Sequence, residues 1–307
     1  MPNWNDIVAE VGGVKQQSPF DIVRRKYLKK VNEITGRNVI IYYSGWLQKP
    51  GQPNEDINDQ DKEGFMTTIN GLDRGLGLDL ILHTPGGSAT ATESLVDYLR
   101  SMFDINIRAF VPQLAMSAGT MVACACSSIF MGRESSLGPI DPQLNGVSAH
   151  GVIEEFEQAR KDMAAPDHRE AVPLWQPIIA KYPPTFIGDC VKAVTWSRSL
   201  VKSWLESGMF AGGGLKDTDF ERILEGLENH ALTLAHDRHL SAADCRRLGL
   251  KILSLEENPA LQDAVLSLHH ACMVTFMGTA AVKIIENHSG TAFIQLVAQA
   301  AVAPKQG

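Results

Sequence analysis

Apolar residues follow two alternating spacings between residues 38 and 131. Short runs rich in β-branched and other apolar residues predict buried strands at 38–43, 78–83, 107–111 and 128–131. Between these runs, apolar residues recur at the spacing of helices with one buried side, at 62–72, 95–103 and 119–126. Thr90 and Glu93 match a capping box for the second of these helices. Strands that alternate with helices in this way predict an α/β core, a parallel sheet with crossover helices.

Helices dominate the predicted structure on both sides of this core. A basic helix is expected at 20–35 and a polar loop at 48–61. Beyond Pro142 the same reasoning predicts helices at 152–163, 185–207 and 218–228, a short helix capped by Ser241 and closed by Gly249, and a helical tail from Asn258 that is apolar on one side. We therefore expect three parts: an N-terminal helix, strand and loop (1–60), the α/β core (61–255) and a helical C-terminal extension (256–307).

Composition and charge narrow the range of partners. The 307 residues carry a formal net charge of −7, which argues against a surface that binds nucleic acid. The five cysteines show no Cys-x-x-Cys spacing and no zinc-type cluster, so we expect reduced thiols and no metal. The N-terminus does not resemble a secretory signal, and no run reaches the roughly 18 to 20 apolar residues of a membrane helix. We expect a cytoplasmic protein with no cofactor and no stable membrane insertion.

Two turns that follow predicted strands carry the candidate chemistry. In the first, Thr84–Gly87, the residues Gly86 and Gly87 let the backbone come close to a substrate carbonyl, and the next helix begins with free N–H groups. In the second, small residues surround Ser117, as a nucleophile requires, and the N–H of Ala118 would be a second oxyanion donor. Both turns are expected at the same edge of a parallel sheet. Each has a structural alternative, a tight strand-to-helix turn for the first and an N-cap for Ser117.

With these motifs in place, the stretch 78–143 resembles the Clp protease/crotonase superfamily. Within it, the stretch is similar to the serine dehydrogenase proteinase family, relatives of signal peptide peptidase A. The residues that carry the resemblance are His83–Gly87, Ala115–Thr120 and Ser136–Gln143, with weaker matches at His236–Ala242 and Leu248–Leu250. The resemblance implies a Clp/crotonase-like sheet, Ser117 as nucleophile, and the N–H groups of Gly87 and Ala118 as oxyanion hole. It also implies a peptide or protein substrate and a homo-oligomer.

The general base stays open at this point. Clp-type peptidases use a histidine, but the corresponding stretch here, 140–143, has none; Asp141 in this stretch would orient a base or close a turn. Relatives of the signal peptide peptidase type use a lysine, and Lys161 lies 44 residues after Ser117 (161 minus 117). It stands on the polar side of its predicted helix, whereas a lysine base needs burial to become neutral. His83 and His236 are the alternative bases, because histidine titrates near neutral pH.

Two other functions fit parts of the same pattern. A crotonase-like enzyme acting on acyl-CoA would use the same pair of backbone donors, but neither turn holds the paired carboxylates that would act as acid and base. A non-catalytic adaptor would retain the fold for assembly, which the unassigned base favours. For a peptidase, the substrate would add as a strand beside Gly86 and Gly87, held by main-chain hydrogen bonds.

Overall fold

A seven-stranded sheet forms the centre of the protein. The computed structural model describes residues 3–165, 171–228 and 238–297. The strands lie in the order β10-β5-β3-β2-β1-β11-β12. Those from β10 to β1 are parallel, whereas β11 and β12 are antiparallel to their neighbours. Their bounds are β1 (Asn38–Ser44), β2 (Leu78–His83), β3 (Ile107–Val111), β5 (Ser128–Met131), β10 (Ile252–Ser254), β11 (Ala281–Asn287) and β12 (Ala292–Leu296).

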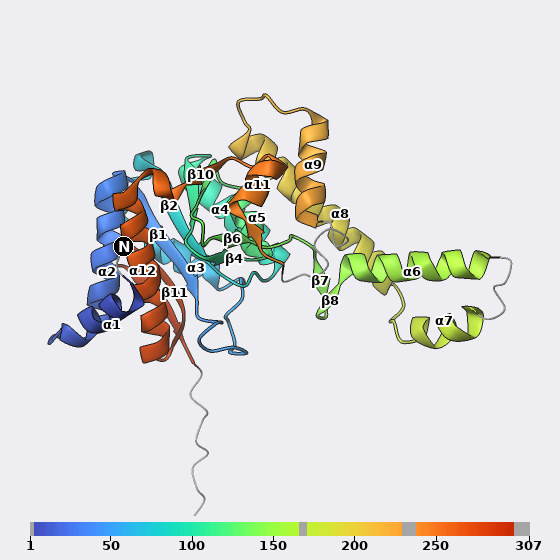
Figure 1. The fold of residues 1–307 in the computed structure, drawn as a ribbon, viewed down its shortest axis with the longest axis horizontal. Coiled ribbons are helices and arrows are strands. Elements are labelled where there is room, and N and C mark those ends of the chain that lie inside the picture. Colours follow the sequence, from blue (N-terminus) through green and yellow to red (C-terminus); the bar gives the residue numbers. More distant parts are fainter. Residues whose placement is uncertain (1–2, 166–170, 229–237, 298–307) are drawn as a thin grey trace, which may run out of the picture.

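Helices cover both faces of this sheet, because successive strand residues point to opposite sides. On one face, Val39 and Ile41 pack in a core with α1 (Trp4–Gly13), α2 (Pro19–Thr35) and α12 (Pro259–Gly278). On the other, Ile40 and Tyr42 belong to a core with α3 (Asp61–Ile69), α4 (Ala89–Phe103), α5 (Ala118–Cys124), α9 (Asp217–Glu228) and α11 (Ala242–Leu248). Figure 1 shows α2 and α12 together on one side and α4, α5 and α11 on the other. The expected α/β core with crossover helices is confirmed.

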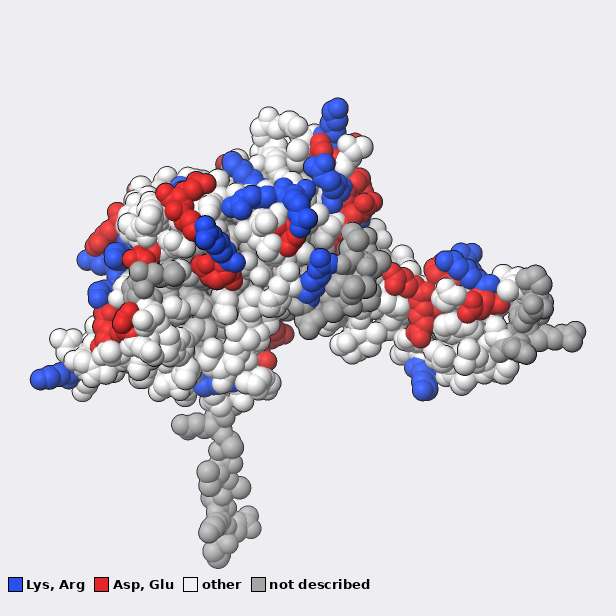
Figure 2. Space-filling model, in the orientation of Figure 1, with Lys and Arg blue, Asp and Glu red and all other residues white. Residues whose placement is uncertain are grey.

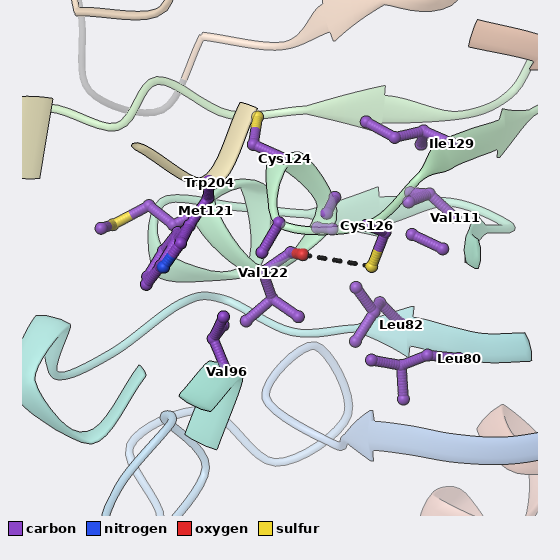
Figure 3. Close-up of a cluster of buried hydrophobic side chains, with 14 of the residues drawn as sticks. Leu80, Leu82, Val96, Val111, Met121, Val122, Cys124, Cys126, Ile129 and Trp204 are labelled. Carbon is purple, nitrogen blue, oxygen red and sulfur yellow. Dashed lines mark hydrogen bonds between the residues drawn. The ribbon is translucent and has the colours of Figure 1, made fainter. Parts of the chain in front are cut away.

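Helix α5 is the most enclosed of these helices, with all seven of its residues buried. In Figure 3, Met121 and Val122 lie beside Trp204, which comes from α8 (Phe186–Trp204), and the Cys126 thiol donates to the Val122 carbonyl oxygen at 3.3 Å. Burial raises the pKa of Cys126 to about 12, and all five cysteines are free and buried. The core therefore holds the start of α5, which follows Ser117, in a fixed position.

A helical arm extends from the body after a short hairpin, β7 (Gln143–Leu144) and β8 (Val147–Ser148). It consists of α6 (Ala149–Ala164), α7 (Ala171–Ile179) and the start of α8, and Figure 1 shows α6 and α7 projecting away from the sheet. The arm has a small core of its own, formed by Ala149, Val152, Phe186 and Cys190. A π-helical turn (Leu205–Met209) follows α8, and two 3-10 turns lie at Arg74–Leu76 and Leu255–Glu257.

A second, three-stranded sheet joins segments that are distant in the sequence. Its strands are β4 (Leu114–Ala115), β6 (Ser136–Leu137) and β9 (Leu240–Ser241), in that order. They come from the second candidate turn, from the Ser136–Gln143 motif and from the late motif after His236. Two of the segments that carry the family resemblance, and the weaker late match, therefore meet in this sheet.

The structure adds two features that the sequence did not predict. The expected C-terminal helix is present as α12, but β11 and β12 follow it and extend the central sheet next to β1. The cap of α4 is Ser88, whose hydroxyl accepts from the Ala91 N–H at 3.2 Å, rather than the predicted pair of Thr90 and Glu93. Pairing with β1 explains the first difference, because a strand stabilised by a distant partner leaves only a short apolar run as its local signal.

Three observations concern the charge, the hydropathy and the possible metal ligands of the described residues. Lys and Arg side chains are interspersed with Asp and Glu on the face drawn in Figure 2. Among the residues that the structure describes, no helix is long and apolar enough to cross a bilayer. The same residues contain no group of three or more His, Cys, Asp or Glu side chains arranged to hold a metal ion.

If β11 is an integral part of the sheet, truncating its core side chain should destabilise the whole protein. Ile285 is fully buried, and we expect Ile285→Ala to lower the free energy of unfolding by about 2 to 5 kcal/mol. Leu296 at the end of β12 is 61% exposed, so Leu296→Ala should change the free energy of unfolding by less than about 0.5 kcal/mol. Urea denaturation measures both; equal effects would contradict the placement of β11.

Candidate active site

The two candidate turns are packed directly against each other. A Cβ atom added to Gly86 would lie 2.7 Å from the Ser117 Cβ and 2.8 Å from the Met116 carbonyl oxygen. The Met116 N–H donates to the Thr84 carbonyl at 3.0 Å, and the Thr84 N–H donates to the Leu114 carbonyl at 3.2 Å. Gly86 also has a φ of +103°, which disfavours any larger residue. Only glycine therefore allows this close contact between the turns.

Ser117 has a strained backbone, with φ 49° and ψ −115°. The surrounding turn holds this conformation: the Gly119 N–H donates to the Met116 carbonyl at 2.7 Å, and the buried Thr120 hydroxyl donates to the Ala115 carbonyl at 2.8 Å. Although Ser117 precedes α5, its side chain makes no capping hydrogen bond. Ser117 therefore stands at the N-cap position of α5 but does not cap the helix with its hydroxyl. Such a strained strand-to-helix turn, with a free hydroxyl, is typical of nucleophiles.

The two candidate oxyanion donors are the backbone N–H groups of Ala118 and Gly87. Ala118 is the first residue of α5, so its N–H has no partner within the helix. The orientation of the other donor, Gly87, is determined by hydrogen bonds between Ile57 and the residues on either side of Gly87. The Ile57 N–H donates to the Gly86 carbonyl at 2.7 Å, and the Ser88 N–H donates to the Ile57 carbonyl at 2.9 Å. Because the Gly86 carbonyl and the Ser88 N–H both face Ile57, the N–H of Gly87 between them points to the opposite edge of this segment, away from Ile57.

A cavity of about 410 Å³ opens at this point, within the range of ligand pockets. Both turns contribute to it, together with the 140–143 segment and α8. Its apolar wall includes Met121, Ile140 and Trp196. The complete lining is Pro85, Gly87, Ser88, Ala89, Thr90, Ser117, Ala118, Met121, Ile140, Pro142, Gln143, Trp196 and Ser197. The nucleophile candidate Ser117 and the two candidate oxyanion donors, Gly87 and Ala118, therefore share one cavity.

Of the predicted bases that the structure describes, neither Lys161 nor His83 lines this cavity. Lys161 is exposed on α6, and its position 12 residues after Ala149 places it about 18 Å along that helix. His83 is fully buried among Tyr43, Trp46 and His269. Burial, and to a lesser extent His269, lowers the pKa of His83 well below its usual 6.5. His236 lies outside the described residues.

A histidine that the sequence analysis did not consider lies closer to the cavity. The Nε2 of His150, in the first turn of α6, is 3.9 Å from Oδ1 of Asp141. Asp141 is only 2% exposed, and its two chain neighbours line the cavity. Asn145 and Gly146, both with positive φ, turn the chain back so that the Ala149 N–H donates to the Pro142 carbonyl at 2.9 Å. The Asn-Gly pair is a known hairpin signal and could have indicated this proximity.

The environment of Asp141 is rich in buried carboxylates. Glu228, at the end of α9, is 4% exposed, and the Ile140 N–H donates to the carbonyl of the preceding Leu227 at 3.0 Å. Burial raises the pKa of Glu228 to about 7; Arg198 opposes this shift, while Asp141 adds to it.

Comparison with known proteins agrees with this fold. Residues 16–170, half of the chain, match the family described as ClpP-like SDH-type serine proteinase, and the chain belongs to this family. Two uncharacterized proteins of Methanocaldococcus jannaschii are similar to it, one 35% identical over 108 residues and the other 32% identical over 100 residues. These stretches cover 35% and 33% of this chain, and 37% and 34% of the relatives. The matches thus span about a third of each curated relative.

Because the two turns are in contact at Gly86, a larger residue at this position should destabilise the protein more than at other glycines with positive φ. We expect Gly86→Ala to lower the free energy of unfolding by about 1 to 3 kcal/mol through overpacking, in addition to the cost of its positive φ. Gly51 is the matched control, because its φ is +79° and an added Cβ would meet nothing within 4 Å. Urea denaturation of both variants separates the two costs. Equal losses would show that the turns are not in contact.

Proposed function

We propose that this protein is a serine peptidase that cleaves peptide bonds through an acyl-enzyme at Ser117. The strained turn of Ser117, with its uncapped hydroxyl in the cavity beside two backbone donors, is the observation that carries the proposal. Membership in a serine proteinase family supports it, and a peptide or protein would be the substrate.

In this mechanism, Ser117 Oγ attacks the substrate carbonyl carbon while a general base takes its proton. The N–H groups of Gly87 and Ala118 donate to the oxygen that becomes negative, and each such donor contributes roughly 3 to 4 kcal/mol in known enzymes. The base then gives its proton to the leaving amine, and the acyl-enzyme remains. Water, deprotonated by the same base, hydrolyses the ester and restores Ser117.

For the general base we propose His150, oriented by Asp141. An imidazole needs no special burial to accept a proton near neutral pH, and Asp141 would stabilise the imidazolium that forms. Lys161 is the base that the sequence analysis favoured, as part of a Ser-Lys dyad, and it is the alternative to His150. It is exposed in this chain, so it lacks the burial that would make its amine neutral.

A homo-oligomer also remains a proposal. Helix α7 has no buried residue although most of its residues are apolar, and Leu174 on it is 63% exposed. Apolar surface of this kind often marks an interface.

Labelling with a fluorophosphonate probe tests the nucleophile and the base together. We expect the wild-type protein to be labelled and Ser117→Ala to remain unlabelled with an unchanged fold. His150→Gln should slow labelling by about 100-fold or more, since general bases contribute 10²–10⁴. Lys161→Met should label like the wild type.

Other outcomes distinguish the alternatives. Slow labelling of Lys161→Met with normal labelling of His150→Gln would assign the base to Lys161. A folded wild-type protein that never reacts would count against a peptidase and favour the adaptor. Hydratase or thioesterase turnover that survives Ser117→Ala would favour an acyl-CoA enzyme.

A further inference from the structure

A buried ion pair lies behind the glycine turn, on the side away from the cavity. Lys283 on β11 and Asp61 at the start of α3 are 0% and 1% exposed, and Nζ lies 2.6 Å from Oδ1. Tyr42 donates its hydroxyl to the second carboxylate oxygen of Asp61 at 2.7 Å. Buried charges are costly unless they are paired and hydrogen-bonded, and these are both.

Both members of this ion pair form hydrogen bonds with the backbone on either side of Ile57. Lys283 Nζ donates to the Asp56 carbonyl at 2.7 Å, and Asp61 Oδ2 accepts from the Asn58 N–H at 3.0 Å. Ile57 itself directs its N–H and carbonyl the other way, to Gly86 and Ser88. The segment is therefore held from one edge by the ion pair, while its other edge holds the glycine turn.

We infer that Lys283 and Asp61 are positioning residues of the oxyanion hole, acting through Ile57 on Gly87. The inference rests on the proposed function of Ser117. The contact is tight: a Cβ added to Gly87 would lie 2.3 Å from the Ile57 nitrogen, so a shift of Ile57 must move Gly87. A displacement of about 1 Å in a catalytic group can cost 10²-fold in rate. The C-terminal strand β11 thus contributes to the site, although it lies beyond the residues that match the family.

The same strand provides a matched control. Arg24 and Glu286 form a second buried ion pair, both 0% exposed and 2.6 Å apart. Arg24 also contacts Asp21 and Thr275, which belong to α2 and α12 on the opposite face of the sheet. Loss of this pair should destabilise the protein without affecting the cavity.

The experiment compares Lys283→Met with Arg24→Met in the full chain, well below both melting temperatures. For Lys283→Met we expect faster hydrogen exchange of the Ile57 and Ser88 amides and about 100-fold slower fluorophosphonate labelling. For Arg24→Met we expect exchange of these amides and labelling within twofold of the wild type, despite a comparable fall in melting temperature. If Lys283→Met does not fold, the double variant Lys283→Met/Asp61→Asn removes both charges and takes its place.

The two readouts separate this inference from the proposed function. Unchanged exchange at Ile57 and Ser88 in the lysine variant would overturn the inference, as would wild-type labelling or an equal loss of labelling in both variants. Failure of the wild-type protein to label would contradict the proposed function, and with it the catalytic part of the inference; the exchange would still show whether the ion pair holds the turn.

Discussion

The contact between Gly86 and Ser117 is the constraint on which the rest of the site depends. It leaves no room for a side chain at residue 86, and it places Ser117, Gly87 and Ala118 in the lining of one cavity. Each turn alone is an ordinary strand-to-helix connection. Together, and with the 140–143 segment and α8, they line one cavity that contains the strained Ser117, Gly87 and Ala118.

The architecture explains how this contact is maintained. Neighbouring parallel strands β2 and β3 lead toward the two turns at the same edge of the sheet, where ligand sites of α/β proteins form. The small sheet of β4, β6 and β9 then ties the serine turn to two later segments. Support from the other side comes through Ile57, which pairs with the glycine turn and is itself held by buried charges. The strain at Ser117 is therefore balanced by surroundings fixed from several directions.

Local patterns allowed the core of the fold and the two turns to be predicted. The strands at 78–83, 107–111 and 128–131 have the predicted bounds, because each is a short run composed mostly of apolar residues. The strand β11 was not predicted, because its partner strand β1 is distant in the sequence. Ser44 of β1, for example, lies opposite Lys283 of β11. His150 was missed for a related reason: its proximity to Asp141 depends on the Asn145–Gly146 turn. Lys161 was selected by its spacing from Ser117, which does not reveal that α6 leaves the body.

The most direct test of the central claim is a crystal structure of the protein after reaction with a fluorophosphonate. The account predicts a covalent bond from Ser117 Oγ to phosphorus, with the phosphoryl oxygen about 2.7 to 3.1 Å from the nitrogens of both Gly87 and Ala118. An adduct on another residue, or a phosphoryl oxygen that points away from these two N–H groups, would contradict it.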